Sequence, residues 1–138
     1  MLENAPAQDI VIQAAAPADY RVENPADQKI KKQDGENLTL TLVENPDVAK
    51  AVGQQKRPGQ VLVGFAAETQ QVTENAIKKL HKKNLDMIVA NDVTAPGAGF
   101  DVNTNIVTLI TGEGMVSLPL MTKDEVADHI LDGILSRS

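Results

Sequence analysis

Cysteine and tryptophan are absent from this sequence of 138 residues, and aromatic side chains make up only 2% of it. Without cysteine, the chain has no disulfide, no thiol nucleophile and no thiolate metal site, which is typical of a protein of the reducing cytoplasm. With so few rings, the core must be aliphatic, and nucleic-acid bases would find almost nothing to stack on. We therefore expect a cytoplasmic location and no nucleic-acid partner.

A surplus of basic charge and a long apolar run are also lacking. Thirteen Lys and Arg residues stand against 19 Asp and Glu residues, and the net charge of −6 repels a phosphate backbone over most of the surface. No stretch approaches the roughly 20 apolar residues that span a bilayer, and the start has no signal-peptide pattern. We expect no membrane partner, and a single domain with one core over residues 1–138.

Three short apolar runs, at residues 9–15, 60–65 and 85–90, have the composition of buried strands. The run at 9–15 is continuous rather than alternating, which predicts a strand covered on both faces. AAET follows the run at 60–65 and leads into a helix predicted over 73–83. This helix lies between the other two strands and completes a βαβ unit with a right-handed crossover. The predicted fold class is therefore α/β with a mostly parallel sheet.

After residue 100 the pattern changes to a hairpin and a helix. NIVTLIT and MVSLPL, on either side of Gly112-Glu113-Gly114, predict an antiparallel hairpin at the edge of the sheet. Thr122 and Glu125 have the spacing of a capping box, and they predict a last helix that ends near Ser136.

A β-arm is predicted over residues 28–43, where two short strands flank Asp34-Gly35 and LTLTLV alternates apolar and polar residues. The segment Asn45-Pro46-Asp47 follows, with an N-cap residue, a proline suited to the first helical position and an acid for the first turn. It predicts the start of a helix that ends near residues 54–59.

Polar residues at two strand ends have two possible roles each. Asp19 follows the first strand, and ligands of open α/β sheets bind at the carboxyl ends of strands, where an acid can contact a metal ion or a polar substrate group. An Asp between Ala and Tyr in a loop can equally be a turn former. Asn91 and Asp92, which end the third strand, are ligand contacts or a loop cap, with a slight preference for the structural role.

Two lysine clusters, one at 29–32 and one in the predicted helix, can focus positive potential on a small anion. Helical periodicity turns Lys78 and Lys82 to solvent and places Lys79 and Lys83 beside the core face. Like charges at i and i+4 repel unless an anion neutralises them, although lysines in a last turn also complement the helix macrodipole. The pair is therefore an anion site or a purely structural pair.

Two kinds of site are disfavoured. The loop at 94–100 lacks the GxGxxG spacing of a dinucleotide site, which argues against a nicotinamide dehydrogenase. His81 and His129 each stand alone, without a second histidine at ligand spacing, which argues against a histidine metal cage.

Several segments occur in the order and spacing that resembles phosphopantothenate–cysteine ligase, the synthetase half of the bifunctional bacterial coenzyme A enzyme. The segments are DIVIQAAAPADYR, QKIKK, LTLVENPDVA, VGFAAET, KKLHKKNLDMIVANDV, GFDVNTNIVTLIT and LPLMTKDEVADHILD. The resemblance runs nearly end to end. Together with the predicted elements, it implies a Rossmann-like three-layer sandwich with an antiparallel edge hairpin and a protruding β-arm.

The family that the chain resembles uses CTP and Mg²⁺ to activate the carboxylate of 4′-phosphopantothenate as an acyl-cytidylate. The amine of L-cysteine then displaces CMP and forms the amide. The resemblance implies the same substrates and divalent ion for this chain, and a homodimer. FMN is implied only if a decarboxylase domain is fused upstream.

The resemblance also implies site residues, motif by motif. Asp19 matches an acid that contacts CTP and its divalent ion, and Lys29 matches the catalytic lysine of the KIKK motif, which also contacts CTP. Lys79 and Lys83 match the pair that holds the triphosphate. The other implied nucleotide contacts are Gln13, Ala15, Pro46, Asp47, Val48, Ala49 and Phe65.

The first part of the family pattern has no counterpart in this sequence. That part contains a first strand, a GGT loop and an asparagine segment implicated in acyl-cytidylate formation, whereas MLENAPAQ is typical of the tail of a helix. We therefore expect nucleotide binding to survive better than ligation. The alternative is a fragment that binds nucleotide or forms a dimer through its arm, without catalytic activity on its own.

Overall fold

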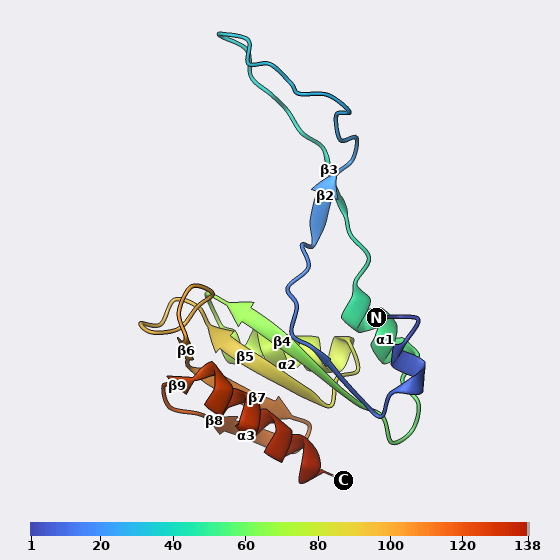
Figure 1. Cartoon of the computed structure of the whole chain (residues 1–138), viewed down its shortest axis with the longest axis vertical. Helices are drawn as coiled ribbons and strands as arrows, with labels where there is room; N and C mark the ends of the chain where they lie inside the picture. Colours follow the sequence, from blue (N-terminus) through green and yellow to red (C-terminus); the bar gives the residue numbers. More distant parts are fainter. Residues whose placement is uncertain (138) are drawn as a thin grey trace. The chain divides into compact units, whose positions relative to one another are not determined.

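The computed structural model describes residues 1–137, and the chain forms two compact units. The first unit contains residues 1–15 and 48–137, and the second contains residues 16–47. Figure 1 shows the strands and helices, with colours that follow the sequence from the N-terminus to the C-terminus. All the α-helices of the described residues belong to the first unit.

The first unit is built around a five-stranded mixed sheet in the order β1-β4-β5-β7-β8. β1, β4 and β5 run parallel, whereas β7 and β8 are antiparallel to their neighbours. The strands are β1 (Ile10–Gln13), β4 (Val61–Glu68), β5 (Met87–Asp92), β7 (Val107–Thr111) and β8 (Gly114–Ser117). The predicted α/β class, with a mostly parallel sheet and an antiparallel edge hairpin, is confirmed.

Helices cover both faces of this sheet and give three layers (Figure 1). α1 (Val48–Gln54) and α2 (Val72–Lys82) pack on one face, and α3 (Lys123–Leu135) packs on the other. Neighbouring residues of β4 enter two separate cores, because side chains alternate along a strand. Leu62 packs with α1 and α2, and Val63 packs with α3. This is the Rossmann-like sandwich that the sequence predicts.

β1 is an edge strand, and only one of its faces is covered. Val11 is 7% exposed in the core beneath α1 and α2, whereas Ile10 and Ile12 are 44% and 38% exposed. Among the described residues, the core around α3 draws on β4, β5 and β7 and takes nothing from β1. The prediction of a first strand covered on both faces is therefore wrong for residues 1–137.

β4 is longer than the sequence predicts. AAET was expected to lead towards a helix, but the strand continues to Glu68 because its pairing with β5 continues until Glu68 lies opposite Asp92. β1 pairs with β4 only as far as Gly64. Within residues 1–137, the last part of β4 therefore extends past the end of its β1 neighbour.

The end of the chain follows the prediction closely. The Glu125 N–H donates to the Thr122 hydroxyl and the Thr122 N–H donates to the Glu125 carboxylate, both at 3.2 Å, which confirms the capping box of α3. One small ladder was not predicted: β6 (Thr104–Asn105) pairs with β9 (Met121–Thr122). Strands this short leave no sequence period to detect.

A short 3₁₀-helix, η1 (Ala5–Ala7), precedes β1 in the segment expected to be helical. Gln60 ties this segment to the start of β4. Its side chain is almost fully buried, and its Nε2 donates to the carbonyl oxygens of Ala5 and Gln8, both at 2.7 Å. A buried amide that is satisfied in this way fixes the N-terminal segment against the sheet.

The second unit is a two-stranded antiparallel ribbon with a long connection. β2 (Tyr20–Val22) pairs with β3 (Leu42–Glu44), and the Glu23 N–H extends the ladder by donating to the Thr41 carbonyl at 2.9 Å. The predicted turn at Asp34-Gly35 is confirmed, with Gly35 at a φ of +78°.

The strands predicted within residues 28–43 are largely wrong, since the paired residues lie at 20–22 and 42–44. The alternating leucines of LTLTLV find no layer to pack on: Leu38 and Leu40 are 67% and 54% exposed. An isolated two-stranded ribbon is marginal in water, so the alternation alone does not make a ladder.

The Asn45 side chain forms hydrogen bonds within the second unit and does not cap a helix. Its Nδ2 donates to the Ala18 carbonyl at 2.8 Å, and its Oδ1 accepts from the Arg21 guanidinium at 3.1 Å. α1 begins at Val48, so the prediction of Pro46 as the first helical residue is wrong. The side chain expected to cap the helix is already engaged by the ribbon.

Candidate functional site

The carboxyl ends of β1, β4 and β5 hold most of the polar groups of interest in the first unit. Ligands of open α/β sheets bind at this edge. Two of these groups are unsatisfied acceptors: Gln13 Oε1, on the last residue of β1, and Asn91 Oδ1, near the end of β5, are buried and have no hydrogen-bond partner within residues 1–137. Orphaned buried acceptors are uncommon in folded proteins, and they often accompany functional sites.

Lys79 reaches this edge from α2 and forms an ion pair with Glu68, the last residue of β4. The Lys79 side chain is 40% exposed and the Glu68 side chain is 14% exposed. A partly exposed lysine side chain is therefore anchored on a mostly buried glutamate side chain. Sequence reasoning found Lys79 but missed Glu68, because the acid of AAET was assigned to the lead into a helix.

The helical-wheel prediction for α2 is confirmed. Lys78 and Lys82 are exposed, whereas Lys79 and Lys83 are partly buried beside the core. Ala76 and Leu80 form the buried stripe of α2, beside Lys79 and Lys83 and away from Lys78 and Lys82.

Phe65 lies on the opposite face of the sheet from Lys79. Ala66 packs in the core beneath α1 and α2, so its neighbour Phe65 must point to the face that α3 covers. Phe65 is 41% exposed there. A single ligand that contacts both Phe65 and Lys79 has to pass over the carboxyl edge of β4, where β4 extends past β1.

The last turn of α1 and the end of α2 also meet in the first unit. The Asn84 side-chain amide donates to the Gly53 carbonyl at 2.9 Å, and Asn84 adopts a left-handed φ of +54° just after Lys83. Ala49 is buried in α1 one turn before Gly53. Lys83, the C-cap of α2, is therefore held by α1, which carries the predicted residues Val48 and Ala49.

Asp92 caps the loop that follows β5, as the structural interpretation predicts. Its Oδ1 accepts from the Thr94 hydroxyl at 2.5 Å and from the Thr94 N–H at 2.9 Å. These two hydrogen bonds, the hydroxyl first, hold the pKa of the Asp92 carboxyl below its ordinary value.

The remaining predicted residues lie in the second unit. Asp19 is exposed, and its carbonyl oxygen accepts from the Asn45 N–H at 2.7 Å. Pro46 and Asp47 are exposed at the end of this unit, and Lys29 is exposed in the connection between β2 and β3. The predicted nucleotide contacts are thus divided between the units. The first unit has Gln13, Ala15, Val48, Ala49, Phe65, Lys79 and Lys83, and the second has Asp19, Lys29, Pro46 and Asp47.

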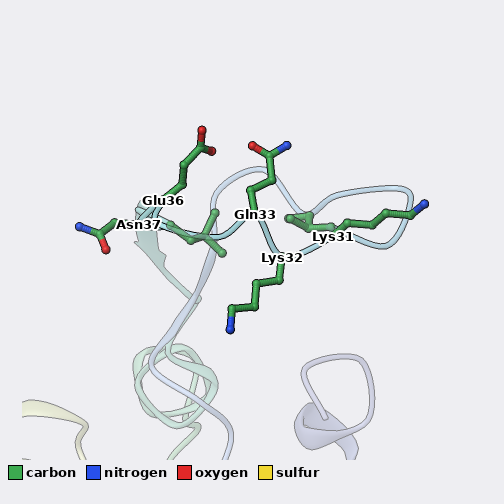
Figure 2. Close-up of a pocket in the computed structure, with 7 residues that line it drawn as sticks. Lys31, Lys32, Gln33, Glu36 and Asn37 are labelled. Carbon is green, nitrogen blue, oxygen red and sulfur yellow. The ribbon is translucent and has the colours of Figure 1, made fainter.

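The connection between β2 and β3 encloses an open hollow of about 480 Å³ (Figure 2). Its lining comes from Ile30 to Gln33 and from Glu36 to Leu38, and all of these residues are exposed. The side chains of Lys31 and Lys32 point in different directions in Figure 2 and do not converge on one point. Lys29 is not part of the lining, so the hollow and the predicted catalytic lysine are separate features.

Metal ligands are sparse. Within residues 1–137, no group of three or more His, Cys, Asp or Glu side chains is arranged to hold an ion. Mg²⁺ usually keeps waters and binds one or two carboxylates together with substrate phosphates. The single predicted ligand, Asp19, is compatible with that mode and not with an all-protein cage.

Within residues 1–137, no helix has the length and apolarity needed to cross a bilayer.

Residues 1–137 match the family model described as the DNA/pantothenate metabolism flavoprotein C-terminal domain. Three proteins named Coenzyme A biosynthesis bifunctional protein CoaBC are similar in sequence. The one from Bacillus subtilis (strain 168) is 50% identical over 96% of this chain and 32% of its own length. The one from Vibrio cholerae serotype O1 is 46% identical over 95% of this chain and 33% of its own length. The one from Escherichia coli K12 is 44% identical over 94% of this chain and 32% of its own length. The chain thus spans about a third of the length of these relatives.

Two solved structures are similar in fold. The crystal structure of the C-terminal domain of the bifunctional protein CoaBC superposes with a TM-score of 0.72 at 39% identity, over 96% of this chain and 56% of that one. The DNA/pantothenate metabolism flavoprotein from Streptococcus pneumoniae gives a TM-score of 0.75 at 21% identity, over 98% of this chain and 64% of that one. The second likeness concerns the fold alone.

Proposed function

Because the chain belongs to the family of the DNA/pantothenate metabolism flavoprotein C-terminal domain, we propose that it carries the CTP-binding part of a ligase in coenzyme A biosynthesis. The ligase joins L-cysteine to 4′-phosphopantothenate. The names of the relatives support the pathway, and the substrates and the use of CTP are our proposal.

One observation carries this proposal: a partly exposed lysine stands at the carboxyl edge of the sheet, and a second lysine follows it one helical turn later. Lys79 is anchored by Glu68, and Lys83 is fixed where α1 meets α2. The Lys79 ammonium has more N–H donors than the one that meets Glu68, and two lysines one turn apart offer charged donors to the oxygens of a polyphosphate. The position of Lys79 agrees with the general rule for ligands of α/β sheets.

The reaction divides into two balanced steps. A carboxylate oxygen of 4′-phosphopantothenate attacks the α-phosphorus of CTP, which forms the acyl-cytidylate and releases pyrophosphate. The cysteine amine then attacks the acyl carbon, which forms the amide and releases CMP and a proton. Lys79 and Lys83 stabilise the charge that develops on the leaving pyrophosphate, and Lys29 supports amide formation from the acyl-cytidylate.

The nucleotide contacts in the proposal are those named from the sequence. Gln13, the last residue of β1, and Ala15, just after it, contribute backbone groups. Phe65 offers a partly exposed ring, and Pro46 to Ala49 offer the segment before and at the start of α1. Asp19 together with the phosphates would hold Mg²⁺, which neutralises phosphate charge. A cytoplasmic homodimer completes the proposal.

A second candidate is a fragment that binds nucleotide or forms a dimer without ligation. It is favoured by one observation, that the chain covers only 56% of the solved C-terminal domain that it resembles.

Product analysis separates the two candidates. The chain is incubated with CTP, Mg²⁺ and 4′-phosphopantothenate, and pyrophosphate is measured before and after cysteine is added. Pyrophosphate followed by CMP identifies the ligase. CTP binding without pyrophosphate identifies the nucleotide-binding fragment, and the absence of both contradicts the proposal.

A further inference from the structure

Glu68 is a feature of the edge that the proposed function leaves without a role. It is the last residue of β4, it faces α2, and its side chain is 14% exposed. An acid this far from solvent requires a cationic partner, and Lys79 supplies it. The pair connects the end of a strand to the last turn of the helix that follows it.

The neighbour of Glu68 makes this partner more important. Asp92 lies opposite Glu68 in the β4–β5 register, so two acidic residues are neighbours on adjacent strands. Asp92 is engaged by Thr94, which offers neutral donors and no positive charge. If Lys79 left Glu68 to follow an anion, a carboxylate whose side chain is only 14% exposed would remain without its cation. Lys79 therefore has to keep its contact with Glu68 while a ligand is bound.

An ammonium group can do both, because it has three N–H donors. One donor is occupied by Glu68, and 40% of the side chain remains exposed, so the others are available to an incoming oxygen. The lysine side chain has four rotatable bonds, and holding its end in one place reduces the conformational entropy that a ligand must remove. Protein kinases use the same arrangement, in which a glutamate holds the lysine that contacts the nucleotide phosphates.

We propose that Glu68 is a positioning residue that fixes the Lys79 ammonium for the phosphate chain of the bound nucleotide. The inference rests on the proposed function and assigns a role to a residue that the family resemblance did not include. Glu68 acts through Lys79 and not by contact with the ligand. Its effect therefore grows with the number of phosphates and vanishes for the nucleoside.

The test compares Glu68→Ala and Glu68→Gln with the unaltered chain by calorimetric titration of CTP, CMP and cytidine. For Glu68→Ala we expect CTP to bind about 10-fold more weakly, the ratio for weakening one charge-assisted hydrogen bond. The affinity for CMP should fall by less, and the affinity for cytidine should not change. Glu68→Gln keeps an acceptor at the same reach, and CTP affinity should stay within about 3-fold of the unaltered chain. Glu74→Gln, an exposed acid in the first turn of α2, is the matched control.

Several outcomes would overturn the role of Glu68. These are an unchanged CTP affinity in Glu68→Ala, an equal loss for CTP and cytidine, or a Glu68→Gln variant that is no better than Glu68→Ala. Circular dichroism checks the fold. If Glu68→Ala does not fold, Glu68→Asp replaces it in the test. The shorter side chain keeps the charge but ends too far from the Lys79 ammonium to hold it. We expect the same loss of affinity for CTP, and none for cytidine.

Inorganic triphosphate separates this inference from the proposed function. The chain could bind triphosphate as tightly as CTP, with the same dependence on Glu68. That result would support the positioning role of Glu68 and contradict a site for the cytidine group. If CTP binds tightly and Glu68→Ala changes nothing, the function stands and the positioning role falls. If neither ligand binds, both are contradicted.

Discussion

Gly53 in α1 lies directly against the backbone carbonyl of Lys83 at the end of α2. A Cβ built on Gly53 would overlap the Lys83 carbonyl oxygen and would stand 2.9 Å from its carbonyl carbon. The obstacle is backbone, which cannot rotate away as the end of a side chain can. This close approach fixes a lysine of the proposed triphosphate pair to the helix that begins with Val48 and Ala49.

Gly53→Ala should therefore destabilise the first unit. We expect a loss of about 2 kcal/mol or more in the free energy of unfolding, the upper part of the range for overpacking, because α1 and α2 must separate. Urea denaturation followed by circular dichroism measures the loss. Gly112→Ala is the control, since nothing lies within 4 Å of a Cβ at that glycine. Equal stability of the two variants would show that the contact is not tight in solution.

Replacing either partly buried lysine of α2 should weaken CTP binding. Lys79→Gln and Lys83→Gln each remove a charge that the proposal places on the triphosphate, and a loss of about 10- to 100-fold in affinity is expected. Lys78→Gln and Lys82→Gln, on the exposed side of the same helix, remove the same charge and should change the affinity by less than about 3-fold. A uniform loss over all variants would indicate general electrostatic attraction and no specific site.

Asp86 should be important for stability at the opposite end of β4 and β5. Its Oδ2 accepts from the Leu62 N–H at 2.8 Å and from the Lys56 ammonium at 3.0 Å. Asp86→Ala leaves a backbone donor and a lysine that is 13% exposed without this partner, so we expect a loss of about 2 to 4 kcal/mol in urea denaturation. Asp86→Asn keeps a hydrogen-bond acceptor, so its free energy of unfolding should fall by less. A loss below about 0.5 kcal/mol, the range of ordinary surface substitutions, would contradict the arrangement.

The Asp92 carboxyl should titrate below its ordinary range, and Thr94→Val should raise its pKa because the hydroxyl donor is removed. A carboxyl whose pKa is lower in the folded state stabilises the fold above the unfolded pKa, and this stabilisation is lost as the pH falls through the folded pKa. Thr94→Val should therefore lose less stability on acidification than the unaltered chain. A carbon-detected NMR titration measures the pKa, and an unchanged value in Thr94→Val would show that the hydroxyl does not cause the shift.

Lys29 allows a test of the ribbon. Lys29→Gln should impair nucleotide binding or product formation while the sedimentation coefficient stays that of the unaltered chain, because the side chain is exposed and outside the β2–β3 ladder. Lys31→Gln, which changes a neighbouring exposed lysine of the same connection, is the control. If Lys29→Gln instead dissociates an oligomer and leaves binding intact, the ribbon is an assembly element.

Elements with a strong local signal could be predicted from the sequence. The capping box of Thr122 and Glu125 needs only residues three apart, and the hairpin of β7 and β8 is marked by glycines on both sides of Glu113. The periodicity of α2 places Lys79 and Lys83 correctly beside the core. These features depend on neighbours along the chain.

Features that depend on distant partners were missed. β4 continues to Glu68 only because Asp92 lies opposite, and nothing within AAET indicates this. Asn45 has the residue type of a helix cap, but Arg21 and Ala18 compete for its side chain. The leucines at 38 and 40 alternate like a strand, yet alternation does not supply a layer to pack against. The Glu68 anchor of Lys79 was missed for the same reason as the end of β4.

The central claim, that this chain binds CTP through the carboxyl edge of its sheet, is tested most directly by calorimetry with CTP and ATP under identical Mg²⁺ concentrations. We predict a saturable heat for CTP and an affinity for ATP at least about 10-fold lower, a difference of about 1.4 kcal/mol. Equal and negligible heats for both nucleotides, with the circular dichroism spectrum of the folded chain intact, would contradict it.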